Sequence, residues 1–351
     1  MARVVLVTGV SRHLGSRLAG QLAADPTIDR VVGVDTTPPS KDDRVRLGRT
    51  EFVRADIRNP LIARVISHAK VDSVVHTSVT ATPGRAGGRT SMKEMNVIGT
   101  MQLLAACQKS ETVRRLVVKS TTSVYGASPR DPAVFTEDTP ARTAPVSGYG
   151  KDAVEVEGYV RGFSRRRPDI TVAVLRFANF IGPTIETPLT RYFALPVVPT
   201  EFGYDPRLQF LHEDDGIEVL RLATLADHPG VFNVAGPGTV LLSQAIRRAG
   251  RVSIPVPAPA MRVVSSLVRR AGLADFSPEQ MRLLTFGRVV DTERLRTQFP
   301  YTPKYSTAEA FSAFLGGRSI TPVVPPERIR QAERVVGAAL GVGGSAVPGR
   351  G

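Results

Sequence analysis

A glycine-containing turn and an aspartate further along the chain are the residues whose types and spacing most directly indicate chemistry. Gly9 and Gly15 lie between an apolar run and a helical pattern. Such a turn brings backbone N–H groups and a helix N-terminus together, and both favour a phosphate group. Asp35 ends the next apolar run, where a carboxylate can hold both hydroxyls of an adenosine ribose. Because that carboxylate would repel a 2′-phosphate, we predict NAD rather than NADP as the cofactor.

The elements that must position these residues alternate along the first half of the chain. Short runs rich in valine, isoleucine and leucine are separated by helical patterns, as is typical of βαβ units around a parallel sheet. The predicted strands are 3–8, 31–35, 51–54, 73–76, 115–119 and 171–176, and the predicted helices are 13–24, 60–68, 92–110 and 151–167. We therefore predict the α/β fold class, with a Rossmann-type doubly wound parallel sheet.

The second half of the chain has a looser pattern. Prolines become frequent, helices shorten, and the strand candidates 208–212 and 230–234 look isolated. We predict an NAD-binding domain over residues 1–179, with a sheet completed by later segments, and a smaller C-terminal substrate-binding lobe over 180–318. Residues 319–351 are expected to form a proline-rich connector, a helix over 327–342 and a glycine-rich tail.

The composition limits the class of protein. With 351 residues, of which 42% are hydrophobic, the chain is long enough for a buried core and is not disordered as a whole. Its one cysteine, Cys107, excludes an internal disulfide framework. No apolar run approaches the roughly 18 residues of a membrane span, and the N-terminus runs directly into a strand pattern without the features of a signal peptide. These features predict a cytoplasmic location.

The net charge of +14 raises the question of an anionic partner. The 46 basic residues, only seven of them lysines, are scattered, and there is no basic stripe interleaved with aromatic residues. We therefore expect no nucleic-acid partner and assign most of the charge to composition. Arginines flank the apolar face of the predicted helix 327–342, so membrane contact is an alternative there. We favour packing of this helix on the protein body or on a second subunit.

Eight segments, in order along the chain, resemble the extended short-chain dehydrogenase/reductase family, which comprises NAD-dependent sugar epimerases and dehydratases. The resemblance covers about residues 3–316 and is nearest to UDP-glucose 4-epimerase-like proteins of actinobacteria. The segments are T-G-x-x-R-x-x-G at 8–15, A-D-I-R at 55–58, H-T-S at 76–78, N-V-I-G-T at 96–100, S-T-T-S-V-Y-G at 120–126, L-R-F-A-N-F-I-G-P at 175–183, H-E-D-D at 212–215 and D-T-E-R-L at 291–295.

The resemblance implies which residues contact NAD. The implied cofactor residues are Gly9, Arg12, His13, Leu14, Gly15, Asp35, Asp56, Ile57, His76 and Asn96. Arg12 is a departure, because the family has a glycine there that lets the backbone approach the pyrophosphate. We interpret Arg12 as replacing close approach with charge; the alternative is that it weakens cofactor binding.

The same resemblance implies a catalytic Tyr-x-x-x-Lys pair and a Ser or Thr from the preceding strand. In the family the tyrosine is the acid/base for the substrate hydroxyl, and the lysine lowers its pKa and binds the nicotinamide ribose. Thr121 and Tyr149 match the hydroxyl and tyrosine positions, which puts Ala153 at the lysine position. Lys151 lies two residues after Tyr149, about 200° round a helix, and reaches it only if the helix begins late or irregularly. The other alignment keeps Lys151 and puts Ser147 at the tyrosine position.

Taken with the resemblance, these residues predict an NAD-dependent sugar-nucleotide epimerase/dehydratase-like oxidoreductase with a displaced or degenerate dyad. Asn179 is expected to contact the nucleotide-sugar substrate, and the chain is expected to form a homodimer through helices 92–110 and 151–167. One alternative is an NAD-binding scaffold or sensor without turnover, and a second is a hydroxysteroid or lipid-alcohol dehydrogenase. No metal is expected, because His212, Asp214 and Asp215 have no further ligand cluster beside them and suit hydrogen bonding between the lobes.

Overall fold

The structure is a computed structural model, and the residues it describes are 3–80, 88–140, 145, 148–270, 277–320 and 322–323. The predicted C-terminal helix 327–342, the glycine-rich tail and Ser147 therefore lie outside the described residues. Of the helices within the described ranges, none combines the length and apolar character needed to span a membrane.

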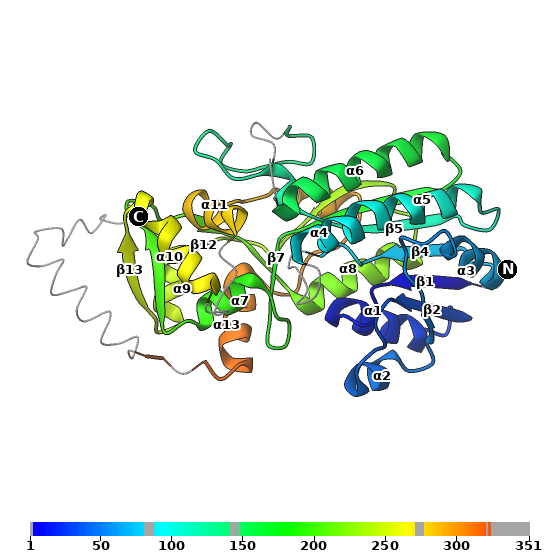
Figure 1. The fold of residues 1–351 in the computed structure, drawn as a ribbon, viewed down its shortest axis with the longest axis horizontal. Helices are drawn as coiled ribbons and strands as arrows, with labels where there is room; N and C mark the ends of the chain where they lie inside the picture. Colours follow the sequence, from blue (N-terminus) through cyan, green and yellow to red (C-terminus); the bar gives the residue numbers. More distant parts are fainter. Residues whose placement is uncertain are drawn as a thin grey trace, which may run out of the picture.

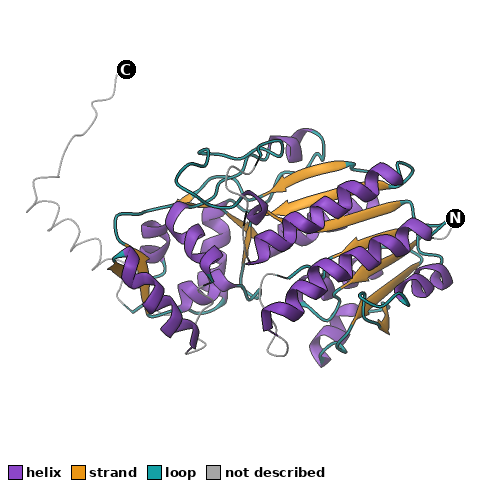
Figure 2. Ribbon diagram, turned by 45° about the horizontal axis from the view of Figure 1, so that its top comes forward, coloured by secondary structure: helices purple, strands orange, loops and turns teal. Residues whose placement is uncertain are grey.

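Seven parallel strands form the central sheet, in the order β11-β6-β5-β4-β1-β2-β3 (Figures 1 and 2). Their bounds are β1 Val4–Thr8, β2 Arg30–Asp35, β3 Glu51–Arg54, β4 Ser73–His76, β5 Arg115–Thr121, β6 Thr171–Phe177 and β11 Gly230–Val234. The strand order reverses between β1 and β4, and doubly wound sheets bind their ligands at such a point. This architecture confirms the predicted fold class.

Helices cover both faces of the sheet (Figure 1). One face carries α1 His13–Ala24, α2 Lys41–Leu47 and α8 Glu213–Leu225. The other carries α3 Ile62–Ala69, α4 Gly88–Lys93, the π-helix η1 Glu94–Ile98, α5 Gly99–Lys109 and α6 Gly148–Arg166. The helix predicted over 92–110 is thus interrupted by a π-helical segment.

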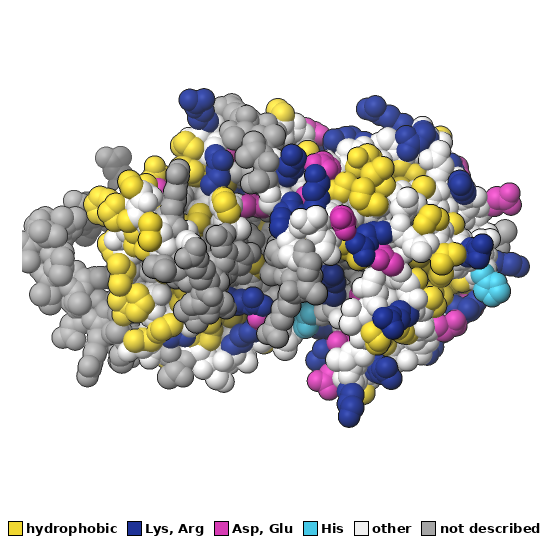
Figure 3. Space-filling model, in the orientation of Figure 1, with side chains coloured by type: hydrophobic (Ala, Val, Ile, Leu, Met, Phe, Trp, Pro, Cys, Tyr) yellow, Lys and Arg dark blue, Asp and Glu magenta, His cyan; other side chains and the backbone are white. Residues whose placement is uncertain are grey.

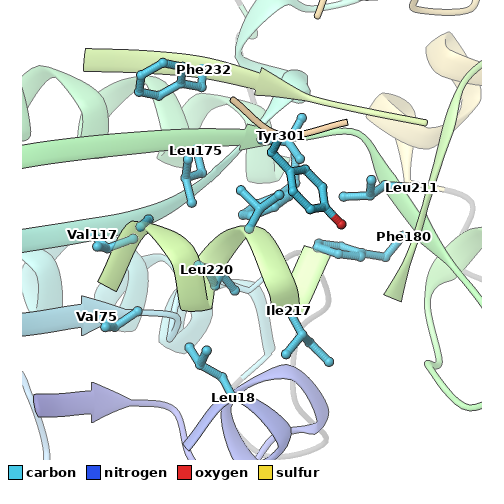
Figure 4. Packing of buried hydrophobic residues seen from close by; sticks show 14 of the residues in the cluster. Leu18, Val75, Val117, Leu175, Phe180, Leu211, Ile217, Leu220, Phe232 and Tyr301 are labelled. Carbon is cyan, nitrogen blue, oxygen red and sulfur yellow. The ribbon is translucent and has the colours of Figure 1, made fainter. Parts of the chain in front are cut away.

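The core of the α1/α8 face joins residues that are far apart in the sequence. Leu220 of α8 packs among Val75 and Val117 of the sheet and Leu18 of α1, and all four are fully buried (Figure 4). Burying an aliphatic side chain of this size contributes about 1.5–3 kcal/mol. The second half of the chain therefore supplies part of the core on which the nucleotide-binding half rests.

Strand β11 corrects one expectation from the sequence. Its residues pair with β6 from Gly230 opposite Ala173 to Val234 opposite Phe177, so the expectation that strand 230–234 is isolated is wrong. The strand candidate 208–212 is divided in two. Its first part is β9 Arg207–Leu208, antiparallel to β12 Val240–Leu241, and its second is β10 Phe210–His212, parallel to β7 Asn179–Ile181.

The remaining elements of the second half form a smaller lobe. It contains α7 Pro188–Ala194, α9 Leu242–Arg248, α10 Ala258–Arg270, α11 Pro278–Phe286, α13 Thr307–Gly317 and the parallel pair β8 Val197–Glu201 and β13 Val252–Val256. Its core is aromatic, with ring centroids of Phe193, Phe210 and Phe311 4.9–6.2 Å apart. The short α12 Glu293–Thr297 packs beside β11 instead. The proposed division of the chain at residues 180 and 318 stays a prediction.

Candidate active site

The turn between β1 and α1 is kept tight by its glycines. Gly9 has a φ of +78°, a left-handed conformation that suits glycine. A Cβ on Gly15 would lie 2.1 Å from the Gly9 carbonyl oxygen, so no larger residue fits there. Arg12 precedes α1 in an extended conformation with its side chain exposed at the rim. The turn therefore has the close packing of a phosphate-binding loop, together with one added cation.

Asp35 lies beside this turn at the carboxyl end of β2. Its Oδ2 accepts a hydrogen bond from the Ser11 N–H at 3.1 Å, and its Oδ1 accepts one from the Thr36 N–H at 2.8 Å. These bonds orient the carboxylate next to the glycine turn, where it can accept hydrogen bonds from the ribose hydroxyls of a dinucleotide. The turn, the helix N-terminus and Asp35 together fit a dinucleotide.

A cavity of about 290 Å³ extends from the turn across the ends of β5 and β6. The second lobe contributes Ile185, Glu186, Thr187 and Pro188 to its wall. The residues predicted from the sequence that line this cavity are Arg12, His13, Leu14, Gly15, Thr121, Tyr149 and Asn179. The structure therefore brings the nucleotide turn, the hydroxyl pair and the substrate candidate into one site.

Thr121 and Tyr149 both line this cavity, and their hydroxyl groups interact. Burial raises the pKa of the Tyr149 phenol above its usual value, and Glu279 raises it further, while the Thr121 hydroxyl acts in the opposite direction. Asp152 and Glu157 add to the acidic surroundings. Tyr149 is therefore protonated at neutral pH and requires a nearby positive charge if it is to act as a base.

The structure does not bring Lys151 to the cavity. Helix α6 begins at Gly148 and continues to Arg166, so the late or irregular start that would turn Lys151 toward Tyr149 is not observed. Lys151 is exposed, whereas Ala153, at the family's lysine position, is buried. The inner side of this helical turn is therefore uncharged at the position where the family has its cation.

The neighbouring Asp152 is fully buried and forms a separate network. Its carboxylate accepts hydrogen bonds from Arg89 Nη1 and Nη2 at 2.7 and 2.6 Å and from Asn96 Nδ2 at 3.1 Å. The Asn96 side chain also accepts a hydrogen bond from the Thr80 N–H and donates one to the Thr80 carbonyl oxygen. Asn96 thus fixes the loop after β4 from within the protein rather than from the cavity wall.

His76 is likewise an interior residue. Its Nδ1 and Nε2 are each 2.9 Å from a threonine hydroxyl, of Thr8 in β1 and Thr100 in α5. Burial lowers the pKa of His76 to about 3, and the charge of Lys119 contributes, so the ring is neutral. The structure places the His76 ring between Thr8 and Thr100, and His76 is not among the residues that line the cavity, so its contact with NAD stays a prediction.

Asp56 and Ile57 follow β3 on the adenine side of the predicted site. Asp56 Oδ2 accepts a bond from Arg58 Nη2 at 2.6 Å, and that hydrogen bond is the main cause of a lowered pKa of Asp56. Ile57 is buried against Gly99, where an added Cβ would lie 2.8 Å from the isoleucine Cδ1. Neither residue lines the cavity described above, so their contact with adenine stays a prediction.

His13 connects the nucleotide turn to the second lobe. Its Nε2 is hydrogen-bonded to the buried Glu213, which also accepts the Thr184 hydroxyl at 2.8 Å. Burial alone would raise the pKa of Glu213, but the bonds from His13 and Thr184 outweigh it and lower this pKa to about 2. The start of α8 is therefore anchored at the mouth of the site by an ionised carboxylate.

The remaining acidic candidates have structural partners. The His212 Nδ1 accepts the Asp214 N–H, and its ring stacks on Tyr305 with centroids 3.9 Å apart. Asp215 accepts bonds from the Tyr301 hydroxyl and the Lys304 N–H, both at 2.7 Å. Within the described ranges, no group of three or more His, Cys, Asp or Glu side chains is arranged to hold a metal.

Lys119 lines the cavity as well, although none of the family motifs assigns it a role. It lies on β5 two residues before Thr121, and its Nζ donates to the Val79 carbonyl oxygen at 2.9 Å. Burial lowers the pKa of Lys119 to about 8, with a further contribution from the charge of Arg12. A lysine at the carboxyl end of the predicted strand 115–119, directly after the apolar residues 116–118, is the signal available in the sequence.

Known proteins similar to this chain identify the family to which it belongs. Residues 5–235 match the model of the NAD dependent epimerase/dehydratase family. The uncharacterized protein Rv0501 of Mycobacterium tuberculosis is 51% identical over 338 residues, which cover 96% of this chain and 90% of that protein. A dTDP-glucose 4,6-dehydratase of Bacillus anthracis, solved with NAD, has a TM-score of 0.69 at 20% identity, covering 91% of this chain and 97% of that one. A UDP-glucose 4-epimerase of Thermotoga maritima, solved with UDP-glucose, has a TM-score of 0.67 at 19% identity, covering 94% and 99%. The chain therefore belongs to the NAD dependent epimerase/dehydratase family, which confirms the resemblance and NAD as the cofactor.

Proposed function

We propose that the chain is an NAD-dependent oxidoreductase of the epimerase or dehydratase type that acts on a nucleotide sugar. The observation that carries this proposal is that Thr121 and Tyr149 lie together in the cavity that begins at the β1–α1 turn. A phenol and a hydroxyl in this position can hold a substrate alcohol and move its proton beside the cofactor.

The residues of the cavity have distinct roles in this reaction. When bound, NAD supplies the acceptor for the hydride that leaves a sugar carbon. Thr121 orients the sugar hydroxyl, and ionised Tyr149 takes the hydroxyl proton as that carbon becomes a ketone. Asn179, at the start of β7, contacts the sugar or its diphosphate, and Arg12 contacts the cofactor pyrophosphate.

The first test identifies the bound molecule and the activity separately. Small molecules released by denaturing the purified protein are identified, and the protein is then assayed with a panel of sugar nucleotides. Tyr149→Phe is expected to lower kcat by about 100-fold or more while NAD affinity is retained. The control is Tyr204→Phe, an exposed tyrosine of the second lobe that does not line this cavity. Turnover that survives Tyr149→Phe would remove Tyr149 as the acid/base.

A second candidate function is an NAD-binding protein without turnover. The observation that favours it is the pair of positions after Tyr149, where Lys151 is exposed and Ala153 is buried. Bound NAD together with no turnover across the panel would select this function.

We also propose that two copies of the chain pair through α5 and α6. These helices contact each other, and Figure 3 shows apolar side chains on the surface above them. Met101 of α5 and Tyr159 of α6 are 39% and 40% exposed, and Ile98, just before α5, is 44% exposed. Contiguous exposed apolar residues are typical of protein interfaces. Analytical ultracentrifugation of the parent protein and of Met101→Asp tests this pairing. The parent is expected to be a dimer and the variant a monomer, and a monomeric parent protein would contradict the proposal.

A further inference from the structure

The cation that α6 lacks is available from β5. We propose that Lys119 takes the place of the missing lysine: its ammonium group faces the NAD site and supplies the positive charge that Tyr149 needs in order to act as a base. This inference rests on the proposed function and goes beyond it by naming the residue that activates the tyrosine.

The strand geometry carries the first step. Alternate residues of a strand point to the same face, so Lys119 and Thr121 leave β5 together. Ser120, between them, points to the other face and donates to Glu157 at 2.6 Å. Lys119, Thr121 and Tyr149 all line the same cavity. The ammonium group thus enters the site from the strand that holds the catalytic hydroxyl, rather than from the helix that holds the tyrosine.

The bonding of Lys119 leaves its charge available. An ammonium group has three N–H donors, and the Val79 carbonyl oxygen accepts one of them. Within the part of the chain that the structure describes, no ion pair includes Lys119. A cation surrounded by protein without a carboxylate is costly to maintain, and such groups are concentrated at functional sites.

Two of the carboxylates around Tyr149 already have cations of their own. Asp152 is paired with Arg89 at 2.6 Å, and Glu157 with Arg176 at 2.6 Å, so these two cations are already matched by carboxylates. Arg12 also lines the cavity, but it lies in the nucleotide turn, where the pyrophosphate is expected. Lys119 is the cavity cation that shares a strand face with the hydroxyl partner of Tyr149.

The experiment compares four variants of the full chain. Lys119→Met removes the charge at nearly constant volume, Lys119→Arg restores it, Lys151→Met tests the rival lysine, and Lys109→Met removes an exposed lysine of α5 as the control. Thermal unfolding first checks that each variant is folded. Calorimetry is expected to show NAD binding about tenfold weaker in Lys119→Met, partly recovered in Lys119→Arg and unchanged in Lys109→Met.

Two further measurements separate an electrostatic role from a merely structural one. The acidic limb of the kcat–pH profile is expected to move to higher pH by about one unit in Lys119→Met, because loss of a nearby positive charge raises the pKa of the base. Trace acetylation followed by mass spectrometry is expected to show that saturating NAD protects Lys119 and leaves Lys151 reactive.

The outcomes distinguish this inference from the proposed function. If NAD does not protect Lys119, or if Lys151→Met moves the acidic limb and Lys119→Met does not, the role of Lys119 is overturned while the oxidoreductase proposal stands. If the parent protein binds NAD and protects Lys119 but turns over no sugar nucleotide, the proposed function is overturned and the place of Lys119 at the cofactor is supported.

Discussion

Glu157 of α6 and Arg176 of β6 form a buried ion pair with 2.6 Å between Oε2 and Nη2. Ser120 of β5 adds a hydrogen bond to the same carboxylate at 2.6 Å. The pair therefore fixes the helix that carries Tyr149 against the strands next to it, one of which carries Thr121. Networks of this kind are rigid when every member is satisfied, so the geometry of the cavity depends on a contact outside it.

Replacing Glu157 by Gln is expected to lower the free energy of unfolding by about 3 kcal/mol, because Arg176 keeps its charge in a buried place without a carboxylate. Urea denaturation of the variant measures this loss. The control is Glu51→Gln, which breaks an ion pair with Arg30 whose two side chains are about half exposed. That variant is expected to lose at most about 1 kcal/mol. Equal losses in the two variants would contradict a special role for the buried pair.

The close approach in the nucleotide turn predicts a second effect. Gly15→Ala would place a methyl group 2.1 Å from the Gly9 carbonyl oxygen, so the turn has to open and NAD binding is expected to weaken by at least about tenfold. Gly158→Ala is the matched control, because nothing lies within 4 Å of the position of its Cβ on α6. The control is expected to bind NAD normally and to be slightly more stable. Calorimetric titration with NAD measures the affinity of both variants, and equal affinities would contradict the role of Gly15 in the turn.

The parts of the fold that were predictable from the sequence are those with local signals. Strands buried on both faces appear as apolar runs, and a glycine turn before a helix marks the nucleotide site. The partner of strand 230–234 is β6, some sixty residues earlier, and nothing in the local pattern identifies that pairing. Likewise, the sequence around His76 does not indicate that its ring is enclosed between Thr8 and Thr100.

The catalytic pair shows a different limit. The family motif has a lysine four residues after its tyrosine on one helix, whereas Lys151 lies two residues after Tyr149. Lys119 lies on another element, and its relation to Tyr149 depends on the pairing of strands and on the direction of a strand face. Only the three-dimensional arrangement brings residues 119, 121 and 149 to one cavity.

The lowered pKa of Glu213 predicts that the stability of the folded protein decreases at acidic pH. Its pKa is lowered from 4.5 to about 2 in the folded protein, chiefly by bonds from His13 and Thr184 that outweigh burial. Since the folded-state pKa lies below the unfolded one, this stabilisation is complete above pH 4.5 and is lost as the pH falls toward 2. The loss amounts to at most about 3 kcal/mol.

Urea denaturation at pH 6 and at pH 3 measures this contribution. The difference in stability between the parent protein and Glu213→Gln is expected to shrink at the lower pH. Asp214→Asn, a change at an exposed carboxylate one residue away, is the control and is expected to show little change of this kind. A constant difference between the parent protein and Glu213→Gln at both pH values would show that Glu213 is not held ionised by its partners.

The lowered pKa of Lys119 predicts that NAD affinity depends on alkaline pH. Burial, and then the charge of Arg12, lower this pKa from 10.5 to about 8, so the ammonium charge is present below pH 8 and is lost above it. Two neighbouring groups keep one charge state in this window: His76, with a pKa of about 3, is neutral throughout, and the raised pKa of Tyr149 keeps its phenol protonated. Glu186 on the outer wall is paired with Arg191.

NAD affinity of the parent protein is therefore expected to fall by up to about tenfold between pH 7 and pH 9.5. Lys119→Met is expected to bind weakly at every pH in this range, because it has no charge to lose. Lys119→Arg is expected to remove the pH dependence while keeping most of the affinity, since a guanidinium group stays protonated throughout. Calorimetry at four pH values is sufficient. An equal slope in the parent protein and in Lys119→Met would assign the titration to another group, because the slope would then persist without the lysine.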